Sequence, residues 1–200
     1  MSQRTRHARR EGRHRLLVTE GVLFPSTRLQ FHFIDPQRRA LVRQAMLEEG
    51  RLLLRPKDES FESDIATLAE IVDYLEFSPQ RTAVTLGGIE RVRLVGVEPR
   101  EGHAMATWRR VDELVSDCIA CNSLVADILG TLDHLSKQGV ELAGEVASMA
   151  AEARDPSAVA DIVGSVTFER GRDQLEHLAQ INVYQRLVAV HSRLVTIVNA

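Results

Sequence analysis

Two cysteines and a histidine are the first residues whose spacing suggests chemistry. Cys118 and Cys121 are three positions apart and His134 follows, which resembles the beginning of a zinc-finger pattern. If this stretch is one helix, Cys121 and His134 lie about 20 Å apart along its axis, at ~1.5 Å per residue. A zinc ligand must lie about 2 Å from the metal. Because both cysteines also fall on an apolar stripe, we predict buried core thiols, with no metal and no cofactor.

Catalytic groups are equally scarce. Ser136 and Lys137 adjoin, but neighbours on a helix point about 100° apart and cannot act as nucleophile and base. A phosphate-binding loop needs G-x-x-x-x-G-K-[ST], and the only lysines are Lys57 and Lys137, neither preceded by glycine. With no Walker A loop and no Ser-Lys dyad, we predict that this chain is not an enzyme.

Three phenylalanines are candidates for binding apolar segments of other proteins. Phe31, Phe33 and Phe77 would mark a binding site if they formed one exposed patch. The alternative is that all three belong to the core of a β-domain.

Three arginines offer a second candidate surface. Arg38, Arg39 and Arg43 lie close together in the stretch that follows Asp35. They either select acidic polypeptide clients or form an ordinary solvated basic face.

The charge is unevenly distributed along the chain. Residues 1–15 contain six arginines and one acid, a net charge of about +5, and the whole chain carries −3. Residues 16–200 therefore carry about −8. The basic segment suits either a polyanion-binding arm or a disordered leader, and the acidic remainder argues against nucleic acid as the main partner.

Composition narrows the class of protein. The chain has 200 residues, 44% of them apolar, enough for one or two compact cores. No apolar run approaches the ~18 residues of a membrane span, and two cysteines suit a reducing cytoplasm. Arginine outnumbers lysine 23 to 2, which is typical of a GC-rich genome. We predict a cytoplasmic, bacterial protein without membrane contact.

The secondary structure that would position these residues is expected to change from strands to helices near Asp112. Before it, Leu29, Phe31 and Phe33 alternate with polar residues as in a half-buried strand. Asp35 and Pro36 form a helix-start signal. The other expected strands are Leu16–Val18, Val22–Phe24, Leu52–Leu54, Ile65–Phe77, Thr82–Leu86, Ile89–Val97 and His103–Val111.

After Asp112 the apolar spacing alternates between three and four residues, as in helices. Five helices are expected, over 114–135, 140–153, from Asp155-Pro156 onward, over 172–180 and over 183–198. The sequence therefore predicts an α+β protein with a leader (1–15), a β-domain with one helix (16–111) and an α-helical bundle (112–200).

Four segments, in order, resemble motifs of the N-terminal, substrate-binding domain of Lon proteases. They are Val22-Leu23-Phe24-Pro25, Ala66-Thr67-Leu68-Ala69-Glu70-Ile71, Gly88-Ile89-Glu90-Arg91-Val92 and Asp155-Pro156-Ser157-Ala158-Val159-Ala160-Asp161. The resemblance covers about Leu16 to Val198. It departs from the family's pattern where Val18–Gly21 replaces Pro-Leu-Arg-Asp, and where Ser26 and Ala66 stand in place of glycines.

The resemblance implies a PUA-like β-pseudobarrel followed by a helical domain. In this family, the module captures unfolded or damaged polypeptides for a downstream AAA+ ATPase and a Ser-Lys protease. This chain would then be the non-catalytic, regulatory part of an ATP-dependent protease in protein quality control. The rival hypotheses are a stand-alone PUA-like protein that binds nucleic acid, and an oligomerisation or adaptor module.

The last expected helix is apolar over more than one face. Val195 and Val198 widen its stripe beyond what one packing partner covers. We expect these two valines to form a surface for self-association or for continuation into a further segment.

Overall fold

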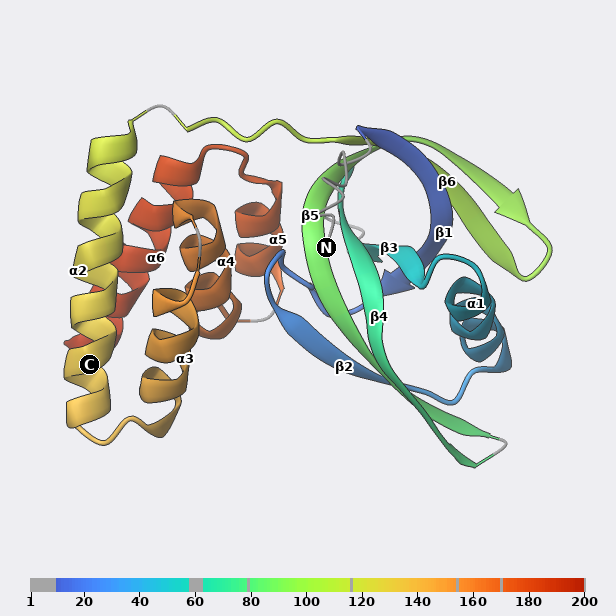
Figure 1. Ribbon diagram of the computed structural model, residues 1–200, viewed down its shortest axis with the longest axis horizontal. Helices are drawn as coiled ribbons and strands as arrows, with labels where there is room; N and C mark the ends of the chain where they lie inside the picture. The colour runs from blue at the N-terminus through green and yellow to red at the C-terminus, as the bar shows by residue number, and fades with distance from the viewer. Residues whose placement is uncertain are drawn as a thin grey trace, which may run out of the picture.

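A computed structural model describes residues 10–57, 63–78, 80–115, 117–153, 155–169 and 171–199. It contains a strand-rich part followed by a helical part (Figure 1). The strands are β1 (Glu11–Thr19), β2 (Arg28–Phe33), β3 (Arg51–Pro56), β4 (Ile65–Ser78), β5 (Arg81–Arg100) and β6 (His103–Arg110), with α1 (Pro36–Leu47) between β2 and β3. The helical part comprises α2 (Cys118–Lys137), α3 (Glu141–Ala151), α4 (Pro156–Thr167), α5 (Arg172–Ala179) and α6 (Val183–Val198). The predicted α+β class is confirmed.

Five strands close into a barrel and the sixth lies outside it. The sheet order is β2-β5-β4-β3-β1-β6, and β5 also pairs with β6, which closes the ring. The first half of β5 pairs with β2, while its second half, from Val92 to Arg100, pairs with β6. Strand β2 is therefore the terminal strand of the sheet.

Side-chain alternation along the strands divides the barrel's apolar residues between two cores. Leu17 and Leu52 point towards α1 and pack with Val42 of that helix. Their neighbours Leu16 and Leu53 point the other way and pack around Trp108. The period of two in the sequence thus supplies both buried faces.

The predicted leader is wrong at its end. Residues 11–15 belong to β1, which pairs with β6 from Glu11 onward. Gly12 lies against Trp108, where a Cβ atom would come within 3.0 Å of the indole ring, and the Trp108 Nε1–H donates to His14 Nδ1 at 2.8 Å. A buried indole therefore fixes residues 11–15, which the sequence-based prediction assigns to a polyanion-binding arm or a disordered leader. Residues 1–9 of the predicted leader lie outside the described residues.

The helices begin where the sequence signals indicate. Asp35 accepts hydrogen bonds from the backbone of Gln37 and Arg38 at the start of α1, and Asp155 accepts one from Ala158 at the start of α4. The segment before α2 differs from the prediction, because Leu114 is exposed in an extended stretch that bridges Asn182. The expected strand over Val22–Phe24 is also irregular.

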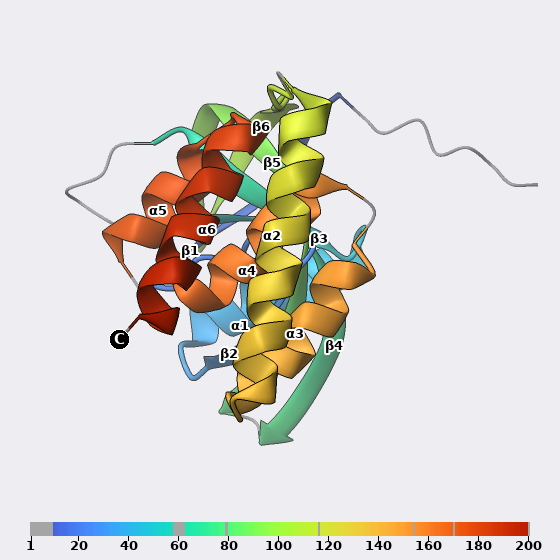
Figure 2. The ribbon, with the colours of Figure 1, turned by 90° about the vertical axis from the view of Figure 1, so that its left-hand side faces the viewer.

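The helical part packs around its own apolar core. Helix α2 contacts α3 and α6, and α4 contacts α6 (Figure 2). Within the described residues, no helix combines the length and apolar character that crossing a bilayer requires. The division into two domains at residue 112 stays a prediction.

Candidate functional site

Two of the family-like segments meet where β5 passes the turn before β2. The Gly88 N–H donates to the Thr27 carbonyl and the Ser26 N–H donates to the Gly88 carbonyl, both at 2.9 Å. A Cβ on Gly88 would lie 2.1 Å from the Phe24 carbonyl oxygen, so only glycine fits here. The Thr67 hydroxyl of β4 donates to the Leu23 carbonyl at 2.6 Å. These contacts fix the direction in which the chain enters β2.

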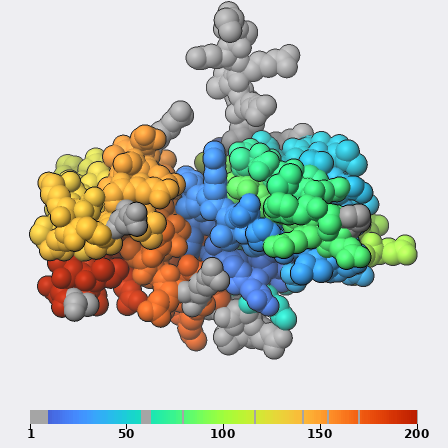
Figure 3. Space-filling view, turned by 90° about the horizontal axis from the view of Figure 1, so that it is seen from below, coloured from blue at the N-terminus to red at the C-terminus, as the bar shows by residue number. Residues whose placement is uncertain are grey.

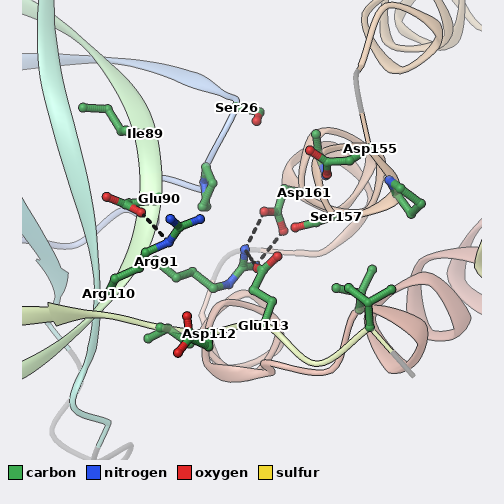
Figure 4. A pocket seen from close by; sticks show the side chains of 16 residues that line it. Ser26, Ile89, Glu90, Arg91, Arg110, Asp112, Glu113, Asp155, Ser157 and Asp161 are labelled. Carbon is green, nitrogen blue, oxygen red and sulfur yellow. Dashed lines mark hydrogen bonds and ion pairs between the residues drawn. The ribbon is translucent and has the colours of Figure 1, made fainter. Parts of the chain in front are cut away.

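Three residues beyond Gly88, β5 carries a buried arginine. Arg91 donates through both terminal nitrogens to the carboxylate of Asp161 in α4, at 2.5 and 2.6 Å. Its Nε–H donates to the Leu178 carbonyl at 2.9 Å, and Nη1 also reaches Glu113 at 3.2 Å. Arg91 thereby attaches the barrel to α4 and to the connecting segment that carries Glu113 (Figure 4). Through Leu178 it also attaches the barrel to α5.

A second buried arginine comes from α6. Arg186 donates to Asp161 Oδ1 and to Glu113 Oε1, each at 2.7 Å, and to the Ser157 hydroxyl at 2.8 Å. We call these five residues the buried ion cluster: Arg91, Glu113, Ser157, Asp161 and Arg186. Two guanidiniums face two carboxylates, so the charges of the cluster balance.

The electrostatics follow from this pairing. Burial alone would raise the pKa of Asp161, but the hydrogen bonds and charge of Arg91, helped by His177 and Arg186, lower it to about 2. His177 lies 3.6 Å from Asp161 and donates its Nε2–H to the Ala160 carbonyl at 3.1 Å. Burial lowers the pKa of His177, against the opposing effect of Asp161. A neutral imidazole thus sits beside an ionised carboxylate.

A cavity of about 440 Å³ adjoins the buried ion cluster. Both Asp161 oxygens are occupied by arginine donors, and Glu113 is held by the same two arginines. Asp161 therefore has both oxygens engaged, and Glu113 accepts both arginines through Oε1. The cluster joins the barrel to the helices.

Two further grooves run between the barrel and the helices. One, of about 520 Å³, is lined by β2, by residues 19–22 and by Ser165, Val166 and Gln174. The other, of about 810 Å³, lies over α3 and α4. Both are bordered by Thr27, Arg28, Ser165 and Val166, so they adjoin each other at these residues. We call them the β2 groove and the α3–α4 groove.

The three predicted phenylalanines do not form one patch. Phe33 is buried and Phe31 half-buried, and their rings stack with centroids 5.9 Å apart on the α1 side of the sheet. Phe77 is 57% exposed and stacks on His32, which points to the opposite side of β2. The period of two places even-numbered and odd-numbered β2 residues on different faces. Phe31 and Phe33 do border the β2 groove.

The three predicted arginines are also divided. Arg38 borders the β2 groove and lies 3.9 Å from Asp35. Arg39 and Arg43, one helical turn apart, border a different hollow with Tyr74 and Glu76. Arg43 forms an ion pair with Glu76 at 2.7 Å.

Other candidate residues are placed clearly. Cys121 is buried as predicted, but Cys118 is exposed because it is the first residue of α2, so its predicted burial is wrong. Lys137 pairs with Asp133 at 2.6 Å. Val195 and Val198 are 41% and 36% exposed. Across the described ranges, no group of side chains has a metal-binding arrangement.

The predictions from sequence do not include a cluster of Arg91, Asp161 and Arg186. Two of these residues, however, stand at positions where the sequence pattern predicts burial. Arg186 lies on the same helical stripe as Val183 and Val190, both buried. Asp161 interrupts an apolar run in α4. A charge on a buried stripe requires a partner of opposite sign, so an arginine and an aspartate placed in this way indicate a buried pair.

Comparison with known proteins identifies relatives of this arrangement. Residues 15–196 match the family described as the ATP-dependent protease La (LON) substrate-binding domain. The N-terminal domain of the Mycobacterium avium complex Lon protease is similar in structure, with a TM-score of 0.76 and 20% identity over 92% of this chain and 98% of that one. The Lon N-terminal domain protein from Xanthomonas campestris has a TM-score of 0.61 and 14% identity, over 90% and 98% respectively. A search of curated proteins finds no match.

Proposed function

The chain belongs to the family of ATP-dependent protease La (LON) substrate-binding domains, and we propose that it binds unfolded or damaged polypeptides without catalysing a reaction. In this proposal a AAA+ ATPase and a Ser-Lys protease supply unfolding and cleavage elsewhere in the same system, in the bacterial cytoplasm.

One observation carries this proposal, the apolar α3–α4 groove. Its border includes Leu142, Met149 and Val166, which are 52%, 42% and 42% exposed. Val146 and Ile162 form a buried floor between them. Apolar side chains gathered around a hollow mark a site where a partner removes them from water. Unfolded polypeptides expose the apolar residues that such a hollow accepts.

The test compares one client in two states. Native lysozyme and reduced, carboxymethylated lysozyme differ in folding, and fluorescence anisotropy measures the affinity of the purified chain for each. We expect micromolar binding of the reduced form, because a flexible client loses conformational entropy when it binds. Native lysozyme should bind at least about tenfold more weakly, because its apolar residues are already buried. Equal affinities for both forms would refute the proposal.

A self-association or continuation surface on α6 remains a second proposal. Val195, Ile197 and Val198 are 41%, 41% and 36% exposed at the end of this helix. Sedimentation velocity of the wild type beside the Val195→Glu/Val198→Glu variant tests self-association. A concentration-dependent oligomer that the variant loses supports it, and a monomeric wild type at every concentration removes it.

A further inference from the structure

Strand β2 offers a free edge to an incoming polypeptide. It pairs with β5 on one side, and no described strand pairs with its other side. The β2 groove follows this second side, because its border includes every residue from Arg28 to Phe33. A hollow that touches consecutive residues of both faces lies along a strand's edge and not over one face.

The hydrogen-bond register shows which backbone groups are directed to this edge. The Gly88 N–H donates to the Thr27 carbonyl, so these two residues are a hydrogen-bonded pair. In an antiparallel ladder such pairs alternate with non-bonded ones. Leu29, Phe31 and Phe33 therefore bond to β5. The N–H and C=O groups of Arg28, Gln30 and His32 point away from β5, into the β2 groove.

The α3–α4 groove continues from the β2 edge and has an acidic border. Among the residues that the structure describes, Glu145, Glu152 and Asp155 line it and Arg28 is the only cation that does. Asp155 already caps α4. Glu145 and Glu152 are exposed and form no ion pair with another described residue. Their charges favour a basic occupant.

Resting on the proposed function, we propose that an extended client segment adds to β2 as a further strand. Its backbone pairs with Arg28, Gln30 and His32, and the residues beyond this strand enter the α3–α4 groove. The segment that fits is apolar with interspersed lysine or arginine. Backbone pairing accepts any sequence, whereas the apolar floor and the two glutamates select its side chains. In Figure 3 the segment from β1 to β2, in blue, lies against the helical part, and the two grooves share Thr27, Arg28, Ser165 and Val166 as lining residues.

Selective N-methylation of a peptide tests the backbone pairing directly. The probe is a short fluorescein-labelled peptide of alternating valine and threonine with flanking lysines, methylated on its backbone nitrogens either at the valines or at the threonines. In an extended strand these two sets of N–H groups point to opposite sides. We expect methylation of one set to weaken binding about tenfold or more, and methylation of the other set to change it less than about twofold. Equal affinities of the two methylated peptides would overturn the proposal.

Variants of the protein test the same edge. Gln30→Pro removes an outward N–H while it leaves the bonds to β5, since proline is tolerated on the free side of an edge strand. It should weaken binding of the unmethylated peptide about tenfold, whereas Gln30→Ala, which keeps the N–H, should leave the affinity within about twofold. Circular dichroism confirms that both variants fold. A folded Gln30→Pro variant with wild-type affinity would overturn the proposal.

Charge reversal tests the selection of side chains. Glu145→Lys/Glu152→Lys should weaken the lysine-flanked peptide about fivefold and strengthen a glutamate-flanked one. The control for non-specific charge is Val97→Lys/Val95→Lys, which adds two positive charges, half the change of +4 made at the glutamates, to exposed positions of β5 outside both grooves. If both double variants change the peptide affinities equally, Glu145 and Glu152 do not select basic clients, and that part of the proposal is wrong. If the wild type binds neither these peptides nor reduced lysozyme, the proposed function itself fails; if it binds reduced lysozyme but is insensitive to N-methylation and to Gln30→Pro, only this inference fails.

Discussion

The buried ion cluster and the β2 edge both lie between the barrel and the helices. They differ in whether their polar groups have partners within the protein. In the cluster, Arg91 and Arg186 are excluded from water and each meets a carboxylate at 2.5–2.7 Å. At the β2 edge, alternate backbone groups have no strand partner among the described residues. A permanent contact needs complementary side chains at fixed positions, whereas a site for many clients needs only backbone groups and apolar surface.

This difference explains why the family-like motifs point to the first region. Gly88, Arg91 and Asp161 belong to those motifs: no Cβ fits at Gly88, and Arg91 and Asp161 form a buried two-point ion pair. The β2 edge contains no residue of these motifs, and Ser26 and Thr27, which set its direction, follow the first motif. In this chain Gly88 fixes the turn before β2, Arg91 and Asp161 join the barrel to α4, and the proposed client surface contains none of the three.

Removing the Asp161 carboxylate, which both arginines share, should cause the largest loss of stability. It is the most direct test of the contrast between the two regions. Asp161→Ala leaves two buried guanidiniums without their common partner, and we expect the free energy of unfolding to fall by about 3–5 kcal/mol. Urea unfolding followed by circular dichroism measures it. Asp133→Ala, which removes an exposed pair with Lys137, is the control and should change little. Similar losses in both variants would show that the cluster contributes no more than a surface ion pair.

A methyl group at Gly88 should have the next largest effect. Its Cβ would lie 2.1 Å from the Phe24 carbonyl oxygen, so the backbone must shift, and Gly88→Ala should destabilise the protein by about 1–3 kcal/mol. Gly130→Ala in α2, where nothing lies within 4 Å, should instead stabilise it by about 0.5–1 kcal/mol because alanine is the better helix former. Thermal unfolding separates the two signs. A Gly88→Ala variant as stable as the wild type would show that the backbone of the turn before β2 can shift to accept a Cβ atom without a loss of stability.

Much of the fold follows from local signals, which explains which predictions succeeded. Asp35-Pro36 and Asp155-Pro156 begin α1 and α4 because a capping carboxylate and a preset φ angle act within one turn. The alternation through Leu29 and Phe33 marks β2 because the pleat has a period of two.

The features that the sequence did not predict depend on contacts between distant segments. Residues 11–15 are placed by Trp108, some ninety positions later, and Arg91 by Asp161, seventy positions later. A local pattern can mark Asp161 as a buried charge, but it does not identify Arg91 as the partner. Phe31, Phe33 and Phe77 do not form one patch, because Phe77 stacks on His32, on the face of β2 opposite to Phe31; the period of two does not report how β4, which carries Phe77, is placed against β2.

Acidification should lower the free energy of unfolding more gradually than these mutations do, through His177 and Asp161. Burial lowers the pKa of His177 below its ordinary 6.5, so the unfolded chain binds this proton more readily than the folded protein. The free energy of unfolding should therefore fall as the pH drops below 6.5. Asp161, whose pKa is lowered from 3.8 to about 2, adds a loss of the same sign between those pH values. Urea unfolding at pH values on both sides of 6.5 measures the slope. His177→Gln keeps a donor for the Ala160 carbonyl and should flatten it; an unchanged slope would show that other groups control this pH range.

The smallest effect is expected at Ser26, where the two regions meet. Ser26 has φ of 61°, in the left-handed region that costs a residue with a side chain about 1 kcal/mol. Its side chain is exposed, and the N–H that binds the Gly88 carbonyl is retained by any residue other than proline. Ser26→Gly relieves the strain but also gives the unfolded chain more freedom.

The balance of these two terms should favour the folded state by about 0.5 kcal/mol. The matched control is Ser192→Gly in α6, exposed but helical, which should lose about 0.5–1 kcal/mol. Differential scanning calorimetry resolves opposite shifts of the melting temperature. Because glycine keeps the same turn, the affinity for reduced lysozyme should not change. A Ser26→Gly variant that is less stable and also binds more weakly would show that the serine side chain itself orients β2, and the separation between a structural region and a client region would then not hold at this turn.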